Sequence, residues 1–350
     1  MPPLQDDANG IGLFCEIQID GHGTSLLVFK TILRRVVRSA TMTLFSHTVR
    51  SSVAFTVCAF VACTSPPPPT VDSSVNAERA AVAEPTMPVA HPPLQYRCVR
   101  TPTPPVFQGR LQQGAWATAG WTRSFEDIEG PFRETPFARC RTKMLWDETY
   151  FYIGAVLEET DLWATYQEHD QIVFHENDFE VFIDPDGDGR EYYEIEVNVL
   201  GTVFDLYLHR PYREDGPAEH GWDASNMLVE VTAFGSINDP SDRDQAWVVE
   251  LAVPWSDFVP PTKRADGSPW SIAPIREHLR RGSAPTVGDA WRVNFSRVQW
   301  DLSADDGVYA KVPDRPEHNW TWTPQWEINM HVPEHWGIVE FVEALKEHTP

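Results

Sequence analysis

Positive charge is scarce in this sequence. The 350 residues include 28 Lys and Arg against 51 Asp and Glu, which gives a formal net charge of −23 at pH 7. Such a field repels nucleic acid and anionic lipid headgroups. We therefore expect no nucleic-acid partner, and a neutral or cationic ligand fits the charge better.

The sequence also lacks an apolar run that suits a membrane-spanning helix. The apolar segment at residues 51–62 is too short, because a spanning helix needs about 20 residues. It is typical of a signal-peptide core, with Met42 and Arg50 upstream and the lipoprotein-like box Phe60-Val-Ala-Cys63 at its end. We predict a lipoprotein signal peptide over residues 42–63, with Cys63 lipidated. The alternative is a simple secretory signal cut near Ala62.

This signal predicts an exported protein that is held at a bacterial membrane, the outer one, through its lipid alone. It would face the periplasm or the cell surface. Residues 1–41 precede the predicted start and show no consistent pattern, so we interpret them as a spurious or disordered extension.

Cysteine is scarce as well, with five residues in the whole chain. Only Cys98 and Cys140 follow Cys63. Export would permit a disulfide between them, but the spacing alone does not establish one, and two buried free thiols are the alternative.

Helical periodicity is weak, and short alternating apolar runs take its place. Residues 64–95 are rich in Pro, Ala and Ser and predict an extended tether. From residue 96 to 350, about nine short alternating runs are separated by Gly, Pro and Asp clusters. This pattern predicts a single all-β domain, an antiparallel β-sandwich of jelly-roll type.

The run from Asp184 to Gly189 has the opening spacing of an EF-hand calcium loop. That loop needs Glu at position 12, which is Ile195 here, and helices on both sides, whereas these flanks alternate like strands. We therefore predict a hairpin with a turn at Pro185-Asp-Gly-Asp-Gly189. Calcium on Asp184, Asp186 and Asp188 is a secondary hypothesis.

The predicted hairpin places carboxylates on one face. With its apolar residues packed inward, Glu180, Glu194 and Glu196 share the opposite face. That face is either solvated or a platform that binds hydroxyl groups.

From about residue 107 to 341 the chain resembles the family 9 carbohydrate-binding modules, in particular their stand-alone bacterial relatives. The blocks that carry the resemblance are Gly114-Ala-Trp116, Phe125-Glu-Asp-Ile-Glu-Gly-Pro131, Met144-Leu-Trp-Asp-Glu-Thr-Tyr-Phe-Tyr-Ile153, Asn177-Asp-Phe-Glu-Val-Phe-Ile-Asp-Pro185, Trp247-Val-Val-Glu-Leu-Ala-Val-Pro-Trp255, Trp291-Arg-Val-Asn-Phe-Ser-Arg297 and the region from Asn319 to Gly337. The resemblance implies a β-sandwich that binds a sugar between two aromatic rings, with polar groups on its hydroxyls and, in some members, structural calcium.

Carried over by position, the resemblance implies polar ligand groups at Glu180 and Glu196. The two stacking tryptophans fall at Phe174 and near Met330, so the aromatic clamp is altered. Substitute carbohydrate-binding residues are Trp320, Trp322, Trp326, Asn329 and His331, with Asn294 and Arg297 in a neighbouring strand. For each tryptophan, core packing is the alternative, and Arg297 has the alternative of pairing with a carboxylate.

We infer non-catalytic capture of an oligosaccharide or polysaccharide for carbohydrate catabolism, by a monomer that requires no cofactor. One alternative is a hydrolase of O-glycosyl bonds, because Glu180 and Glu196 suit the carboxylate spacing of glycosidases. No Gly-x-Ser-x-Gly nucleophile motif or His-Glu-x-x-His zinc motif supports an enzyme. A structural or interaction module at the cell surface is the third hypothesis.

Overall fold

The structure, a computed structural model, describes residues 14–19, 25–30, 92–259, 282–305 and 307–344. The chain divides into two units, residues 1–81 and 82–350. In the first unit, β1 (Phe14–Ile19) and β2 (Ser25–Lys30) pair antiparallel. The predicted signal peptide with Cys63 lies outside the described residues, as does the predicted tether up to residue 91.

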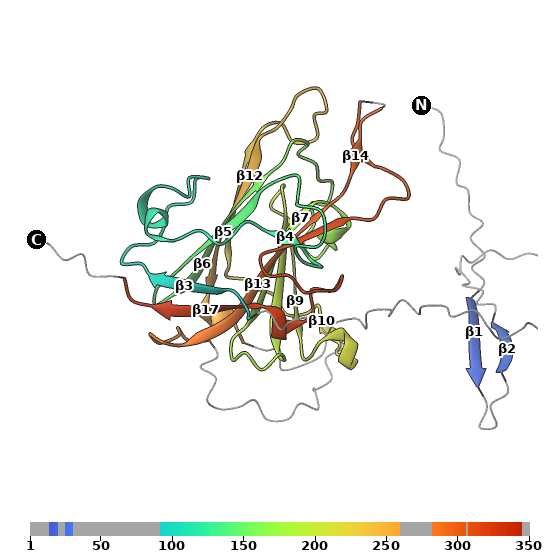
Figure 1. The fold of residues 1–350 in the computed structure, drawn as a ribbon, viewed down its shortest axis with the longest axis horizontal. Helices are drawn as coiled ribbons and strands as arrows, with labels where there is room; N and C mark the ends of the chain where they lie inside the picture. The colour runs from blue at the N-terminus through green and yellow to red at the C-terminus, as the bar shows by residue number, and fades with distance from the viewer. Residues whose placement is uncertain (1–13, 20–24, 31–91, 260–281, 306, 345–350) are drawn as a thin grey trace, which may run out of the picture. The chain divides into compact units, whose positions relative to one another are not determined.

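In the second unit, the described residues form one large sheet of 13 strands (Figure 1). Along the sheet the order is β10-β9-β8-β7-β13-β17-β3-β5-β6-β12-β11, with β16 joining β13 to β4. The strands are β3 (Gln95–Arg100), β4 (Glu126–Asp127), β5 (Cys140–Trp146), β6 (Tyr150–Glu158), β7 (Asp178–Asp184), β8 (Tyr192–Asn198), β9 (Val203–Leu208), β10 (Ala218–Glu219), β11 (Leu228–Phe234), β12 (Ala246–Pro254), β13 (Ala290–Gln299), β16 (His318–Thr321) and β17 (Gly337–Val342).

Short elements connect these strands. Outside the large sheet, β14 (Leu302–Ser303) and β15 (Ala310–Lys311) pair with each other. The 3₁₀ helices are η1 (Gly114–Thr118), η2 (Val173–His175), η3 (Tyr212–Glu214), η4 (Trp255–Asp257) and η5 (Pro333–His335). Within the described part of the chain, no helix is both long and apolar enough to cross a membrane.

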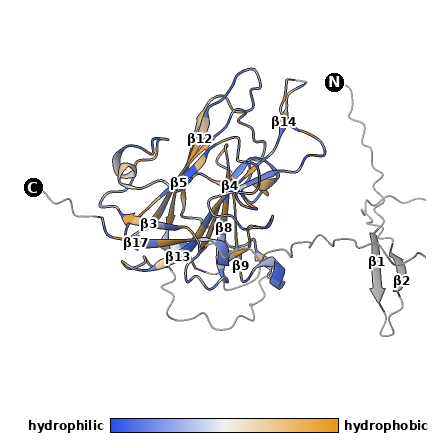
Figure 2. Ribbon diagram, in the orientation of Figure 1, coloured by the Kyte–Doolittle hydropathy of each residue, from blue (hydrophilic) through white to orange (hydrophobic). Residues whose placement is uncertain are grey.

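The predicted fold class, all-β and mostly antiparallel, is confirmed. Val181 and Ile195 belong to strands in one half of the order, Ile153 and Val249 to strands in the other, and all four share one hydrophobic cluster. The single sheet therefore curls so that its two halves enclose the core. Figure 2 shows apolar stretches on strands such as β3 and β12.

Two neighbouring strand pairs are parallel, which the sequence pattern did not predict. Strand β3 pairs in parallel with β17 on one side and with β5 on the other. Alternation of side chains marks a strand but carries no information on its partner. Cys98 on β3 and Cys140 on β5 are free and buried, so the alternative of two thiols describes this structure.

The predicted hairpin forms as expected. Strands β7 and β8 pair antiparallel with Glu180 opposite Glu196. In the turn, Gly187 and Gly189 adopt φ of 68° and 81°, a backbone region that glycine enters without steric cost. Their amides donate to the two carboxylate oxygens of Asp184, at 2.9 and 2.8 Å.

Arg297 lies inside the protein, so its predicted place in a sugar-binding rim is wrong. Its side chain is fully buried on the core face of β13. Its Nη2 is 2.5 Å from Oε2 of buried Glu159, and its Nη1 donates to the Glu158 carbonyl at 2.6 Å. Residues three apart on a strand face opposite ways, which separates Arg297 from Asn294. The alternative of pairing with a carboxylate is the one observed.

Replacement of Arg297 by Leu should destabilise the fold strongly. It leaves the Glu159 carboxylate buried without its cation, which typically costs about 3–5 kcal/mol. Urea denaturation of both proteins measures the difference in the free energy of unfolding. The matched control is Arg139→Leu, which breaks the exposed pair with Glu158 and should cost below about 1 kcal/mol. Equal effects of the two substitutions would contradict the structural role of Arg297.

Candidate functional site

Four acidic side chains share the face of the β7–β8 hairpin that points away from the main core. Asp178 and Glu180 come from β7, Glu194 and Glu196 from β8, and each is at most 5% exposed. Carboxylate oxygens of Asp178, Glu180 and Glu196 lie within 4.8 Å of one another. The predicted acidic face therefore exists, but it is buried rather than solvated.

A second apolar layer explains this burial. Phe182 and Tyr192 on the hairpin pack with Met330 and Trp336 from the C-terminal segment and with Val173 of η2. The acidic residues share the hairpin face of Phe182 and Tyr192, so they lie next to this layer. Burial disfavours ionised carboxylates.

Burial raises the pKa values of all four carboxyl groups. It raises the pKa of Glu180 to about 7, and those of Asp178, Glu194 and Glu196 well above the ordinary range, with repulsion from neighbouring carboxylates adding to the rise in these three. The cluster therefore retains protons near neutral pH. It offers hydroxyl groups both hydrogen-bond acceptors and protonated carboxyl donors.

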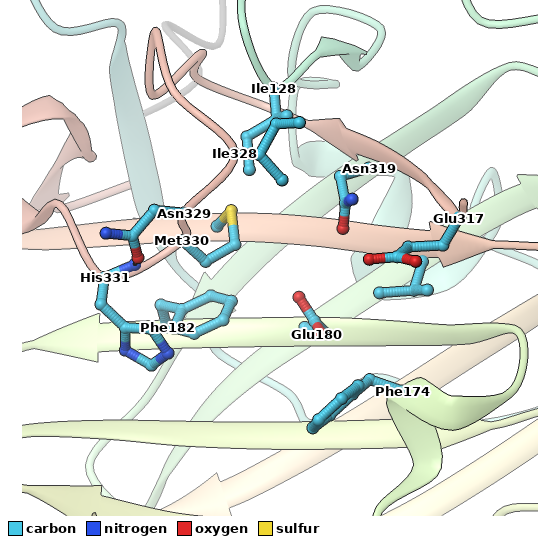
Figure 3. Close-up of a pocket in the computed structure, with 11 residues that line it drawn as sticks. Ile128, Phe174, Glu180, Phe182, Glu317, Asn319, Ile328, Asn329, Met330 and His331 are labelled. Carbon is cyan, nitrogen blue, oxygen red and sulfur yellow. Dashed lines mark hydrogen bonds between the residues drawn. The ribbon is translucent and has the colours of Figure 1, made fainter. Parts of the chain in front are cut away.

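A cavity of about 210 Å³ opens beside this cluster (Figure 3). Glu180 is the member of the acidic cluster that lines it. The lining residues are Ile128, Phe174, Glu180, Phe182, Val298, Glu317, Asn319, Ile328, Asn329, Met330 and His331. Four residues predicted for the site, Phe174, Glu180, Asn329 and His331, are thus brought together.

Phe174 and Met330 flank the carboxyl group of Glu180. Figure 3 shows Phe174 on one side of Glu180 and Met330 on the other. Phe174 is 39% exposed, and its backbone N–H donates to Glu196 at 3.3 Å. These are the two positions at which the family resemblance implies stacking rings, and here they carry one aromatic and one thioether side chain.

His331 is held in place at the opposite end of the cavity from Phe174 and Glu317 in Figure 3. Its Nδ1 is hydrogen-bonded to the Tyr192 hydroxyl at 2.9 Å, and its backbone N–H donates to Oδ1 of Asn329 at 2.9 Å. Burial lowers the pKa of His331 to about 4. The imidazole is therefore neutral at pH 7 and adds a polar but uncharged edge to the cavity.

Other predicted binding residues have structural roles. Trp320 and Trp322 are each 2% exposed in the main core, so packing, the alternative for each, is what the structure shows. Asn294 is fully buried, and its side-chain amide exchanges two hydrogen bonds of 3.0 Å with the backbone of Thr323. These three residues position the C-terminal segment and do not face the cavity.

Trp326 lies at a different cavity. This second hollow, of about 450 Å³, includes Arg123, Glu126 and His335 in its lining together with Trp326. The Trp326 ring is tilted against Phe132, with 6.5 Å between ring centroids, and Phe132 is 85% exposed. An aromatic ring beside charged groups gives this hollow some features of a sugar site, without the buried acidic cluster.

Asn319 and Glu317 line the first cavity but were not predicted. The alternation of side chains along the strand could have identified Asn319. On β16, Trp320 lies opposite Arg297 and Asn319 lies opposite Val298, so Asn319 and Trp320 face opposite ways. Once Trp320 is assigned to the core, Asn319 is assigned to the cavity face.

The carboxylates of the hairpin turn form a separate group. Oxygen atoms of Asp184, Asp186 and Asp188 lie within 4.8 Å of one another, a donor set that suits Ca²⁺. Both oxygens of Asp184 already accept turn amides, and burial raises the pKa of Asp184 to about 8. A cation there would share Asp184 with the turn.

Glu180→Gln should stabilise the protein at alkaline pH. Between about pH 4.5, the ordinary pKa of Glu, and about pH 7, folded Glu180 keeps a proton that the unfolded chain has released. The stability that it contributes is therefore lost as the pH rises through this window. The variant lacks this loss, so its advantage in the free energy of unfolding should grow by on the order of 3 kcal/mol between the two ends.

Urea denaturation at about pH 5 and about pH 8 measures this change. The control is Glu230→Gln, an exposed residue of β11, for which the difference from the parent should not vary with pH. A pH-independent difference for Glu180→Gln would show that the folded carboxyl group titrates normally.

Comparisons with known protein families and solved structures show similarity to carbohydrate-binding proteins. Residues 108–272 match the sequence profile of the family described as Carbohydrate family 9 binding domain-like. The comparison with curated proteins found no match.

Three solved structures are similar at 13% sequence identity. A proposed carbohydrate-binding protein from Bacteroides uniformis covers 71% of this chain and 99% of its own, with a TM-score of 0.49. A family 9 carbohydrate binding module from Caldicellulosiruptor kristjanssonii was solved with cellotriose and with glucose. These two structures each cover 73% of this chain, and 97% and 100% of their own, with TM-scores of 0.40. Through the match over residues 108–272, the chain carries a domain like those of carbohydrate-binding family 9.

Proposed function

We propose that the protein binds carbohydrate non-catalytically in the cavity beside Glu180. The observation that carries the proposal is a buried carboxyl group between Phe174 and Met330, at an opening lined by amide and imidazole groups. A sugar ring presents apolar C–H faces and a rim of hydroxyl groups. The two flanking side chains suit its faces, and Glu180, Asn319, Asn329 and His331 suit its hydroxyls.

The cavity favours a small ligand unit. Its volume of about 210 Å³ is below the range of roughly 300–1,000 Å³ that is typical of drug-sized ligands. We propose that one sugar residue of a longer chain occupies it. Cello-oligosaccharides are the first ligands to test, because a similar structure holds cellotriose.

The electrostatics favour binding over hydrolysis. A glycosidase pair needs two carboxyl groups that differ in pKa, with one kept ionised as nucleophile or base. Here burial raises the pKa of Glu180 to about 7, and burial with repulsion from neighbouring carboxylates raises the pKa of Glu196 well above its ordinary range, so neither is held ionised as a nucleophile or base must be. The site therefore has hydrogen-bonding capacity without the division of roles that hydrolysis requires.

The test is calorimetry of the purified full-length protein with cello-oligosaccharides, after a glycan array has widened the choice of sugars. Glu180→Ala and Phe174→Ala should each weaken binding at least 10-fold, because each removes a direct contact to the ligand. The control Trp326→Ala alters only the second hollow and should bind as the parent does. Calcium is included in one series, because we propose a structural ion at Asp184, Asp186 and Asp188 as a subordinate hypothesis.

Three results would contradict this proposal. Absence of binding to every sugar would exclude carbohydrate as the ligand. Loss of binding in Trp326→Ala alone would move the site to the second hollow. Release of reducing sugar that disappears in Glu180→Gln would identify a hydrolase.

We propose further that the protein is exported and anchored through a lipid on Cys63, where it captures sugar for bacterial catabolism. The support is the signal-like segment and the box at residues 60–63. Cys63→Ala should move the protein from the membrane fraction to the soluble fraction, as measured by immunoblotting of fractionated cells. An unchanged distribution would contradict lipidation.

A further inference from the structure

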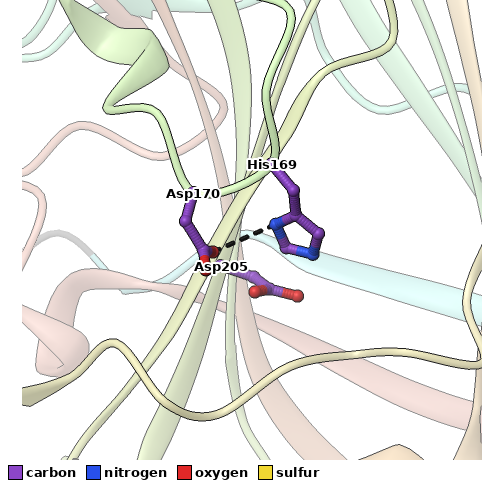
Figure 4. Close-up of side chains that lie close together, drawn as sticks. All are labelled: His169, Asp170 and Asp205. Atoms are coloured by element: carbon purple, nitrogen blue, oxygen red, sulfur yellow. Dashed lines mark ion pairs between the residues drawn. The ribbon is translucent and has the colours of Figure 1, made fainter.

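A second group of titratable side chains lies away from the acidic cavity. His169 and Asp170 belong to the segment that precedes η2, Asp205 to strand β9, and Asp223 to the segment that follows β10. Figure 4 shows the polar ends of His169, Asp170 and Asp205 converging. One potential ligand atom from each of these three residues lies within 4.8 Å of the others.

We propose that His169, Asp170 and Asp205 bind a divalent transition-metal ion. Ligand atoms around Zn²⁺ lie about 2.0–2.2 Å from the ion, so neighbouring ligand atoms lie roughly 3–3.5 Å apart. The separation of 3.0 Å between Nδ1 of His169 and Oδ1 of Asp170 is of this size. Small side-chain rotations would complete the site, because His169 and Asp170 are each about half exposed.

Asp205 supplies an observation beyond the clustering of charges. Its side chain is only 1% exposed, and Oδ2 accepts the backbone N–H of Ala224 at 2.9 Å. Oδ1 is buried without a hydrogen-bond partner. An unsatisfied buried carboxylate oxygen is costly, and a bound cation at this cluster would satisfy it.

Both nitrogens of His169 have carboxylate neighbours. Nδ1 is 3.0 Å from Asp170, and Nε2 is 3.4 Å from Oδ1 of Asp223. When Nδ1 binds the ion beside Asp170, Nε2 can therefore donate its proton to Asp223. Metal-binding histidines commonly have this arrangement, which fixes the orientation of the ring.

The donor set selects the kind of ion. Imidazole nitrogen with carboxylate oxygen suits Zn²⁺ and other first-row divalent ions, whereas Ca²⁺ and Mg²⁺ prefer oxygen ligands alone. Zn²⁺ and Mn²⁺ are therefore the probes of choice, and Ca²⁺ is the discriminating comparison.

The site is independent of the proposed sugar cavity. Asp205 lies opposite Ile195, and Glu196 lies opposite Phe204, so Asp205 and Glu196 point to opposite faces of the sheet. The ion would join β9 to the segments around residues 169 and 223. It would act on the stability of the fold rather than on the ligand.

Calorimetry with ZnCl₂, MnCl₂ and CaCl₂ on the untagged full-length protein tests the proposal. The parent should bind one Zn²⁺ per chain through this site, more tightly than Ca²⁺, with an increase in the unfolding temperature. His169→Ala and Asp170→Asn should each weaken Zn²⁺ binding at least 10-fold and abolish the thermal shift. Both positions are exposed, so circular dichroism should show folded variants.

The matched control is His318→Ala. It removes another surface histidine beside a carboxylate, Nε2 being 3.2 Å from Asp301, and should leave Zn²⁺ binding unchanged. Absence of Zn²⁺ and Mn²⁺ binding would overturn the proposal and identify the cluster as a histidine ion pair. Equal Zn²⁺ affinity in His169→Ala would overturn it as well, by placing the ion elsewhere, for example on the turn carboxylates.

Discussion

The alternation of side chains along β7, β8 and β13 is the constraint on which the site depends. Val181, Ile195 and Phe295 face the main core, while Glu180, Glu196 and Ser296 lie on the opposite face in register with one another. A slip of one residue would bury the carboxylates in the core and expose the apolar set, so the register is strongly specified. This register therefore places the carboxyl group of Glu180 at the cavity.

Buried polar groups attach the connecting segments and the C-terminal segment to the sheet. Asn294 binds the backbone at Thr323, and Arg297 joins β13 to Glu159 beyond the end of β6. Glu250 of β12 accepts hydrogen bonds from the amides of Gln108 and Gly109 and from the Trp116 indole. The Asn294 amide and the Glu250 carboxylate are engaged within the protein, and Arg297 is fully buried, so none of the three is available to a ligand. In the acidic cluster, Oδ2 of Asp178 and Oε2 of Glu194 are buried without a hydrogen-bond partner, as is Oδ1 of Asp205.

Much of the fold was predictable from local pattern, and the site was predictable only in part. The hairpin, its turn and the carboxylates on one face follow from residues near one another in sequence. The core role of Trp320 does not follow from its sequence neighbours, because the same residue types occur in strands and in the core. Only the pairing of β16 with β13 places the Trp320 ring beside Arg297. The cluster at His169 was not predictable for a similar reason, since His169 and Asp205 are distant in sequence and only the fold brings them together.

By itself the sequence determined the all-β class, the alternation of the strands and the acidic character of one hairpin face, because these depend on side-chain period and turn chemistry. Only the tertiary structure decided that this face is covered by a second apolar layer, that Glu180 opens into a cavity between Phe174 and Met330, and that Arg297 is a core residue. Burial and partners depend on contacts between distant segments. Local sequence specifies which face a side chain takes, but not what will cover it.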